Sequence, residues 1–129
     1  MPKYFAYYRW PLLCVATACS LSLWLFILLG QSKSFAEWNW VDILGEGGAT
    51  VFIGIWIFFI IKSRPLGRVT NYIFYGLCFI FFHMWMDSLD EFIRLPKEIM
   101  WDAWLESIPF PIGLCLFTIG IYFWHQEEQ

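Results

Sequence analysis

The chain has 129 residues, of which 60% are hydrophobic, 22% aromatic and only 15% charged. This composition is too apolar for an ordinary soluble domain and indicates an integral membrane protein. It excludes a disordered chain, a collagen-like fibre and a nucleic-acid-binding protein, since these need polar, repetitive or basic sequences. The formal net charge is -3, and the distribution of the charges is more informative than their sum.

Four apolar runs are long enough to cross a bilayer, which takes roughly 20 helical residues. They are continuous rather than alternating, so they predict helices and not the strands of a barrel. The runs cover residues 11–30, 41–61, 69–86 and 108–124. We therefore expect an all-α protein, an integral membrane four-helix bundle in which residues 1–129 form a single transmembrane domain.

The charges predict how the bundle is oriented. Five of the eight basic residues precede the first run or lie in the short turn between the second and third runs: Lys3, Arg9, Lys62, Arg64 and Arg68. Most of the acidic residues fall on the other side. The positive-inside rule therefore predicts that both termini are cytoplasmic.

Residues 97–107, between the third and fourth runs, predict a short amphipathic helix. It follows Pro96 and carries Trp101, Trp104 and Leu105 at helical spacing. Such a helix lies in the membrane interface before the fourth span, with Trp101 and Trp104 as its anchors.

The cysteines do not predict redox chemistry. Cys14, Cys19, Cys78 and Cys115 all fall inside apolar runs, and no two of them form a Cys-x-x-Cys pair. We expect them to be small core residues. Cys14, Ala18 and Ser22 also share one helix face, which would let the first helix approach a neighbour or a second protomer closely. A homodimer is the expected assembly.

Ionisable side chains gather near the outer ends of the second, third and fourth runs. On a helix, Asp87 and Asp90 lie within about 40° of His83. Glu46 stands among Gly45, Gly47 and Gly48, which would allow close helix packing or a distorted first turn. Charged groups within a span are costly and are candidates for function. The predicted binding residues are Glu46, His83, Asp87, Asp90 and Glu106.

Two kinds of ligand suit this cluster. An imidazole with carboxylates one turn away could hold a divalent metal such as zinc, or the group could gain and lose a proton near neutral pH. Two structural interpretations stay open beside these. The carboxylates could form a solvated acidic face, and His83 could be a hydrogen-bonded interior histidine.

Several short motifs carry a resemblance to a known family. These are Leu44-Gly45-Glu46-Gly47-Gly48, Ser63-Arg64-Pro65-Leu66-Gly67-Arg68-Val69-Thr70-Asn71, Leu89-Asp90-Glu91-Phe92 and Leu105-Glu106-Ser107. Residues 40 to 129 resemble the N-terminal membrane sensor regions of some bacterial diguanylate cyclases and related signalling proteins. The resemblance implies an inner-membrane input module whose last helix feeds a cytoplasmic GGDEF output domain.

This chain has no GG[DE]EF loop, so we assign it no enzymatic activity and expect the output domain to lie outside it. The predicted function is sensing at the outer acidic cluster, relayed inwards through the fourth helix. One alternative is an intramembrane metal-dependent hydrolase, although only one histidine lies near the cluster. A small proton-coupled transporter that uses Glu46 is the other.

Overall fold

Four apolar stretches of the chain form α-helices in the computed structural model, which describes residues 7–32, 34–64, 67–94 and 107–128. A helix satisfies its own backbone hydrogen bonds, as an apolar environment requires. The helices of the described residues are α2 (Arg9–Leu29), α3 (Trp40–Ser63), α4 (Arg68–Phe92) and α6 (Pro109–Glu127). The prediction of an all-α protein is confirmed, apart from two strands of two residues each.

Three helices of the described part, α2, α3 and α4, are long and apolar enough to cross a membrane. They leave large apolar side chains such as Leu21, Trp24 and Phe59 exposed, which suits contact with lipid. The fourth predicted span, residues 108–124, does form α6, but α6 is not among these candidate spans. Its first turn contains two prolines and its last turn is polar, so its apolar stretch is shorter than in the other three.

The ends of α3 follow from the local sequence. Asn39 caps the first turn, where its side-chain oxygen accepts a hydrogen bond from the backbone nitrogen of Asp42 at 3.4 Å. Asparagine suits this position because its short side chain reaches a backbone N–H that has no partner within the helix. At the other end the backbone of Arg64 is extended, as is favoured for a residue that precedes a proline.

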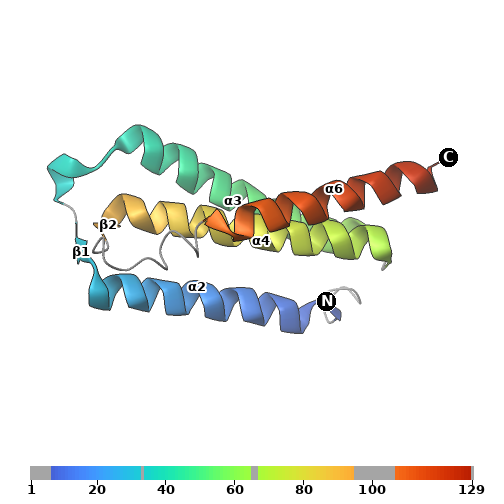
Figure 1. Ribbon diagram of the computed structural model, residues 1–129, viewed down its shortest axis with the longest axis horizontal. Helices are drawn as coiled ribbons and strands as arrows, with labels where there is room; N and C mark the ends of the chain where they lie inside the picture. Colours follow the sequence, from blue (N-terminus) through green and yellow to red (C-terminus); the bar gives the residue numbers. More distant parts are fainter. Residues whose placement is uncertain (1–6, 33, 65–66, 95–106, 129) are drawn as a thin grey trace.

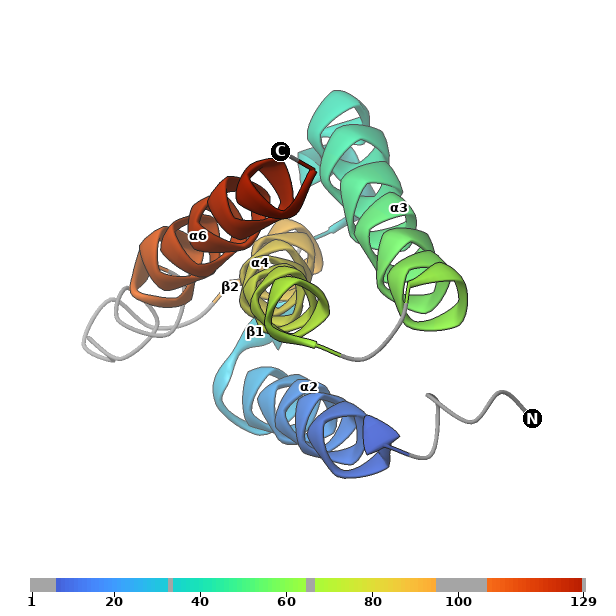
Figure 2. The same ribbon diagram turned by 90° about the vertical axis from the view of Figure 1, so that its right-hand side faces the viewer.

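Helix α4 lies at the centre of the described structure (Figure 2). α2, α3 and α6 each pack mainly against α4 and only weakly, if at all, against one another. Successive helices run in opposite directions, so α2 begins at the same end of the molecule at which α6 ends (Figure 1). α4 also continues to Phe92, beyond its predicted end at residue 86. Residues 97–106 of the predicted interfacial helix lie outside the described residues.

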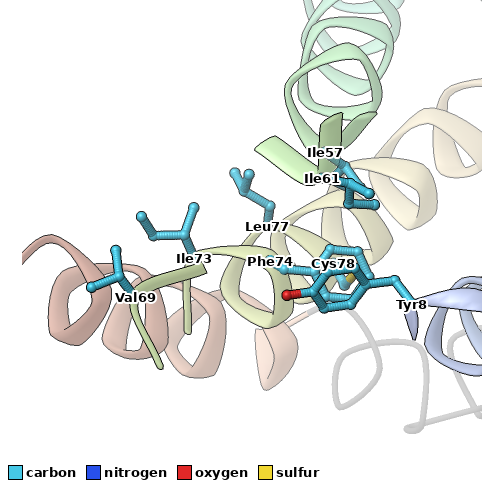
Figure 3. Close-up of a cluster of buried hydrophobic side chains, with 8 residues drawn as sticks. All are labelled: Tyr8, Ile57, Ile61, Val69, Ile73, Phe74, Leu77 and Cys78. Carbon is cyan, nitrogen blue, oxygen red and sulfur yellow. The ribbon is translucent and has the colours of Figure 1, made fainter. Parts of the chain in front are cut away.

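The main hydrophobic core joins the start of α4 to α3 and to the residue that precedes α2 (Figure 3). Tyr8 is completely buried there, with its ring centroid 4.4 Å from that of Phe74. Its hydroxyl donates a hydrogen bond to Asn71 Oδ1 at 2.7 Å. Burial raises the pKa of Tyr8 to about 12, so the hydroxyl keeps its proton at neutral pH. The cluster comprises Tyr8, Ile57, Ile61, Val69, Ile73, Phe74, Leu77 and Cys78.

A second, smaller core lies at the opposite end of α4, where α2 packs against it again. Phe26 of α2 is buried with Met86 and Leu89 of α4. In the same region the indole nitrogen of Trp85 donates a hydrogen bond to the carbonyl oxygen of Cys19 at 3.1 Å. α2 is therefore fastened to α4 near both of its ends.

Three glycines allow the backbones of α4 and α6 to touch. A Cβ atom at Gly76 would lie 2.7 Å from the backbone nitrogen of Phe117, and one at Gly113 would lie 2.8 Å from the carbonyl oxygen of Gly76. A Cβ atom at Gly120 would lie 3.0 Å from the backbone nitrogen of Ile73. Membrane helices use small residues in this way, because close approach brings many atoms into van der Waals contact. This interface is absent from the sequence-based predictions.

The glycines around Glu46 behave differently. Within the described residues, a Cβ atom at Gly45, Gly47 or Gly48 would meet no other atom within 4 Å. The close packing expected there from the sequence is therefore not observed. α3 runs without interruption through this stretch.

All four cysteines lie within the described residues, and all are free thiols. Cys19 and Cys78 are buried between helices, as predicted for small core residues. Cys14 and Cys115 are exposed on α2 and α6, so that prediction is wrong for these two. The sequence does not separate the two cases, because an apolar environment outside the protein suits a thiol as well as a core does.

A short two-stranded sheet joins the ends of α2 and α4. β1 (Gln31–Ser32) pairs antiparallel with β2 (Ile93–Arg94). Beside it, the 3-10 turn η1 (Phe35–Glu37) begins an aromatic cluster in which the rings of Trp38 and Phe92 lie 5.1 Å apart. The connection between α2 and α3 is thus held against the end of α4.

Candidate functional site

The start of α3 and the end of α4 lie together at one end of the molecule (Figure 1). We call this region the acidic end and define it by the carboxylates Asp42, Glu46, Asp87, Asp90 and Glu91. The region at the other extremity carries the basic residues Arg9, Lys62, Arg64 and Arg68, together with Glu127 and Glu128, and we call it the basic end. Most of the described acidic residues therefore lie at one end of the helices and most of the basic residues at the other, although Arg94 of β2 lies at the acidic end.

His83 and Asp87 form the best-defined polar pair of the acidic end. His83 Nε2 lies 3.2 Å from Asp87 Oδ2, and less than a fifth of either side chain is exposed. The two residues are four apart on α4, so they lie one above the other on one helix face. The ring of His83 also packs against Phe110 in the first turn of α6, at 4.6 Å between ring centroids. His83 is therefore in contact with a carboxylate on one side and with α6 on the other.

Glu46 is the carboxylate whose surroundings are least favourable for a negative charge. Its Oε2 atom is buried and has no hydrogen-bond partner among the described residues. Its carboxyl group interacts with the charges of four others, in decreasing order Asp87, Glu91, Asp42 and Asp90. A buried charge without a partner is costly, and like charges nearby add to that cost. This position would gain free energy by taking up a cation.

A hydroxyl contact fixes α3 against α4 one turn from Glu46. Thr50 Oγ1 donates a hydrogen bond to the carbonyl oxygen of Glu46 at 2.7 Å and lies 3.3 Å from Ser88 Oγ. Ser88 Oγ also reaches the carbonyl oxygen of Met84, at 2.9 Å. Neither residue was among those predicted from the sequence. A threonine and a serine in an apolar helix were the only signal, and their pairing depends on how the two helices face each other.

The structure brings some of the predicted site residues together and leaves others apart. His83 and Asp87 touch, and Glu46 is within electrostatic reach of Asp87 and Asp90. Glu106 and the predicted anchors Trp101 and Trp104 lie outside the described residues. Within the described ranges, no three His, Cys, Asp or Glu side chains are arranged to hold a metal ion. The described part of the site thus offers a histidine–carboxylate pair and a carboxylate with one buried oxygen that has no hydrogen-bond partner.

At the basic end, two arginines hold the last turns of α6. The guanidinium carbon of Arg64 lies 4.2 Å from the ring centroid of Trp124, and that of Arg68 lies 4.1 Å from the ring centroid of Phe123. Arg68 Nε is also 3.7 Å from Glu127 Oε1. Cation–π contacts of this kind attract α6 to the connection between α3 and α4. The sequence alone does not predict these contacts with α6.

Comparison of the chain with protein-family models, with curated proteins and with solved structures finds no match. The resemblance to the sensor regions of diguanylate cyclases therefore stays a prediction.

Proposed function

We propose that this chain is the membrane-embedded sensory input module of a bacterial signalling protein. In this proposal the four helices cross the inner membrane as a bundle, with both termini in the cytoplasm and the acidic end outside. α6 relays the signal to a cytoplasmic output domain. The observation that carries the proposal is the position of His83, which touches both the carboxylate of Asp87 and the first turn of α6.

The separation of charge supports this topology. Arg9, Lys62, Arg64 and Arg68 lie at the end where α2 begins and α6 ends (Figure 1). Basic residues at the ends of spans favour the cytoplasmic side, and Glu127 and Glu128 weigh little in that rule. The glycine interface supports α6 as a fourth span, because a helix whose backbone touches that of α4 shares its environment.

The same contacts support a relay through α6. α6 meets His83 at its first turn, α4 along the glycine interface, and Arg64 and Arg68 at its last turns. A change at His83 would therefore act on a helix that is held along its length. The glycine interface restricts small movements of α6 against α4, because tightly packed surfaces move between discrete arrangements rather than deforming continuously.

The stimulus that fits the acidic end best is a cation, either a proton or a divalent metal. A cation bound at Glu46 would reduce the repulsion between the carboxylates of α3 and α4. It would also alter the charge that Asp87 presents to His83. The response requires that the cation bind one arrangement of the helices more tightly than the other, and a tenfold difference corresponds to about 1.4 kcal/mol.

A fusion protein tests this proposal. The chain is joined through its last helix to a diguanylate cyclase domain, and cyclic diguanylate formation is measured in membranes between about pH 5 and pH 8, with and without Zn²⁺. We expect output to change with pH or with zinc. Glu46→Gln and His83→Gln should abolish that change, because neither keeps the group that binds a cation.

Matched substitutions at the basic end serve as controls. Glu128→Gln and His125→Gln make the same chemical changes on exposed residues at the end of α6 and should leave the response intact. An unchanged response in both site variants would remove the acidic end as the sensor. Movement of protons across proteoliposomes that depends on Glu46, without any change in output, would indicate a transporter instead.

A further inference from the structure

An apolar groove lies between α2 and α4 and encloses about 580 Å³. This volume is within the range of ~300–1,000 Å³ typical of small-molecule sites. One wall runs from Trp10 to Ala18 on α2, and the other from Tyr75 to Phe82 on α4. Pro109 at the start of α6 also lines it. The groove begins at the basic end, where α2 starts, and extends towards the middle of the membrane-spanning helices.

The groove stays open because α2 is fastened to α4 on either side of it. Towards the basic end, Tyr8 is completely buried and hydrogen-bonded to α4. Beyond the groove, Cys19 and Phe26 are buried against α4. Between these attachments, the side chains of Cys14 and Ala18 are too small to fill the space up to Phe82. The hollow is therefore part of the folded arrangement.

The length of the groove matches that of an acyl chain within one leaflet. The eight residue steps from Trp10 to Ala18 rise about 12 Å along α2, which is close to the half-thickness, about 15 Å, of a ~30 Å hydrocarbon core. The groove is therefore about as long as the part of one acyl chain that lies within a single leaflet.

A cation stands at the mouth of the groove. The guanidinium carbon of Arg9 lies 5.1 Å from the ring centroid of Trp10, which lines the groove. Arg9 is exposed and at the boundary expected for the headgroups of the leaflet on that side. Basic residues in this position attract anionic headgroups. We propose that the groove binds one acyl chain of an anionic phospholipid from the leaflet at the basic end, with its phosphate at Arg9.

Photo-cross-linking tests the site. The full chain is reconstituted into phosphatidylcholine vesicles that contain a trace of phosphatidylglycerol with a diazirine on one acyl chain. Cross-linked residues are then mapped by mass spectrometry. We expect labelling to concentrate on the groove-lining residues of α2 and α4, and to be competed by unlabelled phosphatidylglycerol more strongly than by added phosphatidylcholine. Labelling spread evenly over the lipid-facing surfaces of α2, α3 and α6 would overturn the proposal.

A pair of alanine substitutions provides the matched control. Ala18→Trp fills the groove, whereas Ala16→Trp adds the same side chain to the exposed face of α2. Groove labelling should fall in Ala18→Trp and persist in Ala16→Trp, with helicity by circular dichroism equal in both. Equal labelling in the two variants would contradict the proposal. If Ala18→Trp instead changes the fraction of cross-linked dimers and leaves lipid labelling intact, the groove contacts a second copy of the chain.

Arg9→Gln tests the headgroup contact without altering the groove. We expect the preference for phosphatidylglycerol over phosphatidylcholine to fall about five-fold, which corresponds to the ~1 kcal/mol typical of one basic residue near an anionic membrane surface. Lys62→Gln removes a charge of the same sign from α3, away from the groove, and should leave the preference unchanged. An undiminished preference in Arg9→Gln would overturn the assignment of the phosphate to Arg9.

Discussion

Gly76→Ala should loosen the contact between α4 and α6. The added methyl group would lie 2.7 Å from the backbone nitrogen of Phe117, whereas ordinary contact begins near 3.4 Å. The helices would have to separate by the difference of about 0.7 Å, because backbone atoms, unlike side-chain ends, cannot turn away. A gap of this size forfeits about a quarter to a half of each affected van der Waals contact.

The loss of stability in Gly76→Ala is best measured by comparison with Gly54→Ala in α3. There the new methyl group would lie 3.4 Å from the ring of Phe81, which is ordinary contact. Both substitutions gain the same helix propensity, about 1 kcal/mol, so this contribution cancels between them. The difference that remains is the cost of overpacking, about 1–3 kcal/mol. Gly76→Ala should therefore have the lower free energy of unfolding by this amount.

The assay is reversible unfolding of the purified chain in mixed micelles, followed by circular dichroism as the fraction of denaturing detergent rises. The pair of variants is compared under identical conditions, so that only differences are interpreted. If Gly76→Ala and Gly54→Ala unfold at the same point, the backbones of α4 and α6 are not in contact and the relay proposed through α6 loses its physical basis.

Three further predictions concern contacts at other places. Tyr8 has its pKa raised by burial from 10.0 to about 12, so the native state favours the protonated hydroxyl. Its contribution to stability should be complete below about pH 10 and be lost as pH rises towards 12, a loss that Tyr8→Phe should not show in pH-dependent unfolding. Arg64→Ala removes the cation–π contact with Trp124 and should destabilise the last turns of α6 by ~0.5–2 kcal/mol, seen as faster amide exchange there, with Lys62→Ala as the control that leaves exchange unchanged. Thr50→Val keeps the shape of the side chain but removes its hydroxyl contact with α4, and should lower the free energy of unfolding by ~0.5–1.5 kcal/mol; no loss would show that this contact is not formed.

The helices themselves follow from the sequence, because long apolar runs and capping residues act locally. The same holds for the pair His83 and Asp87, since residues four apart share a helix face whatever lies around them. Contacts between helices do not follow in this way. The pairing of Thr50 with Ser88 and the contact of Gly76 with Gly113 depend on the rotation of each helix about its axis, which composition does not specify.

The charged residues and the glycines show which contacts a sequence pattern can predict and which it cannot. The sequence predicts that most acidic residues gather at one end of the helices. It does not predict the cation–π contact of Arg64 with Trp124, because this contact joins residues 60 positions apart. Conversely, the sequence predicts close packing at Gly45 and the glycines beside it, but among the described residues these positions face open space. Glycine permits close approach, but only a partner helix at that position produces it.

The central place of α4 has a consequence for how the chain assembles during its synthesis. α2 and α3 leave the ribosome first, yet each finds its main packing surface only on α4. The hydrogen bonds from Tyr8 to Asn71 and from Trp85 to Cys19 span 63 and 66 residues of sequence. α2 and α3 can remain in the bilayer as single helices until α4 is made, since each satisfies its own backbone hydrogen bonds. α4 is the least apolar of the three candidate spans, so the last of them to be made is the one that depends most on neighbours already in place.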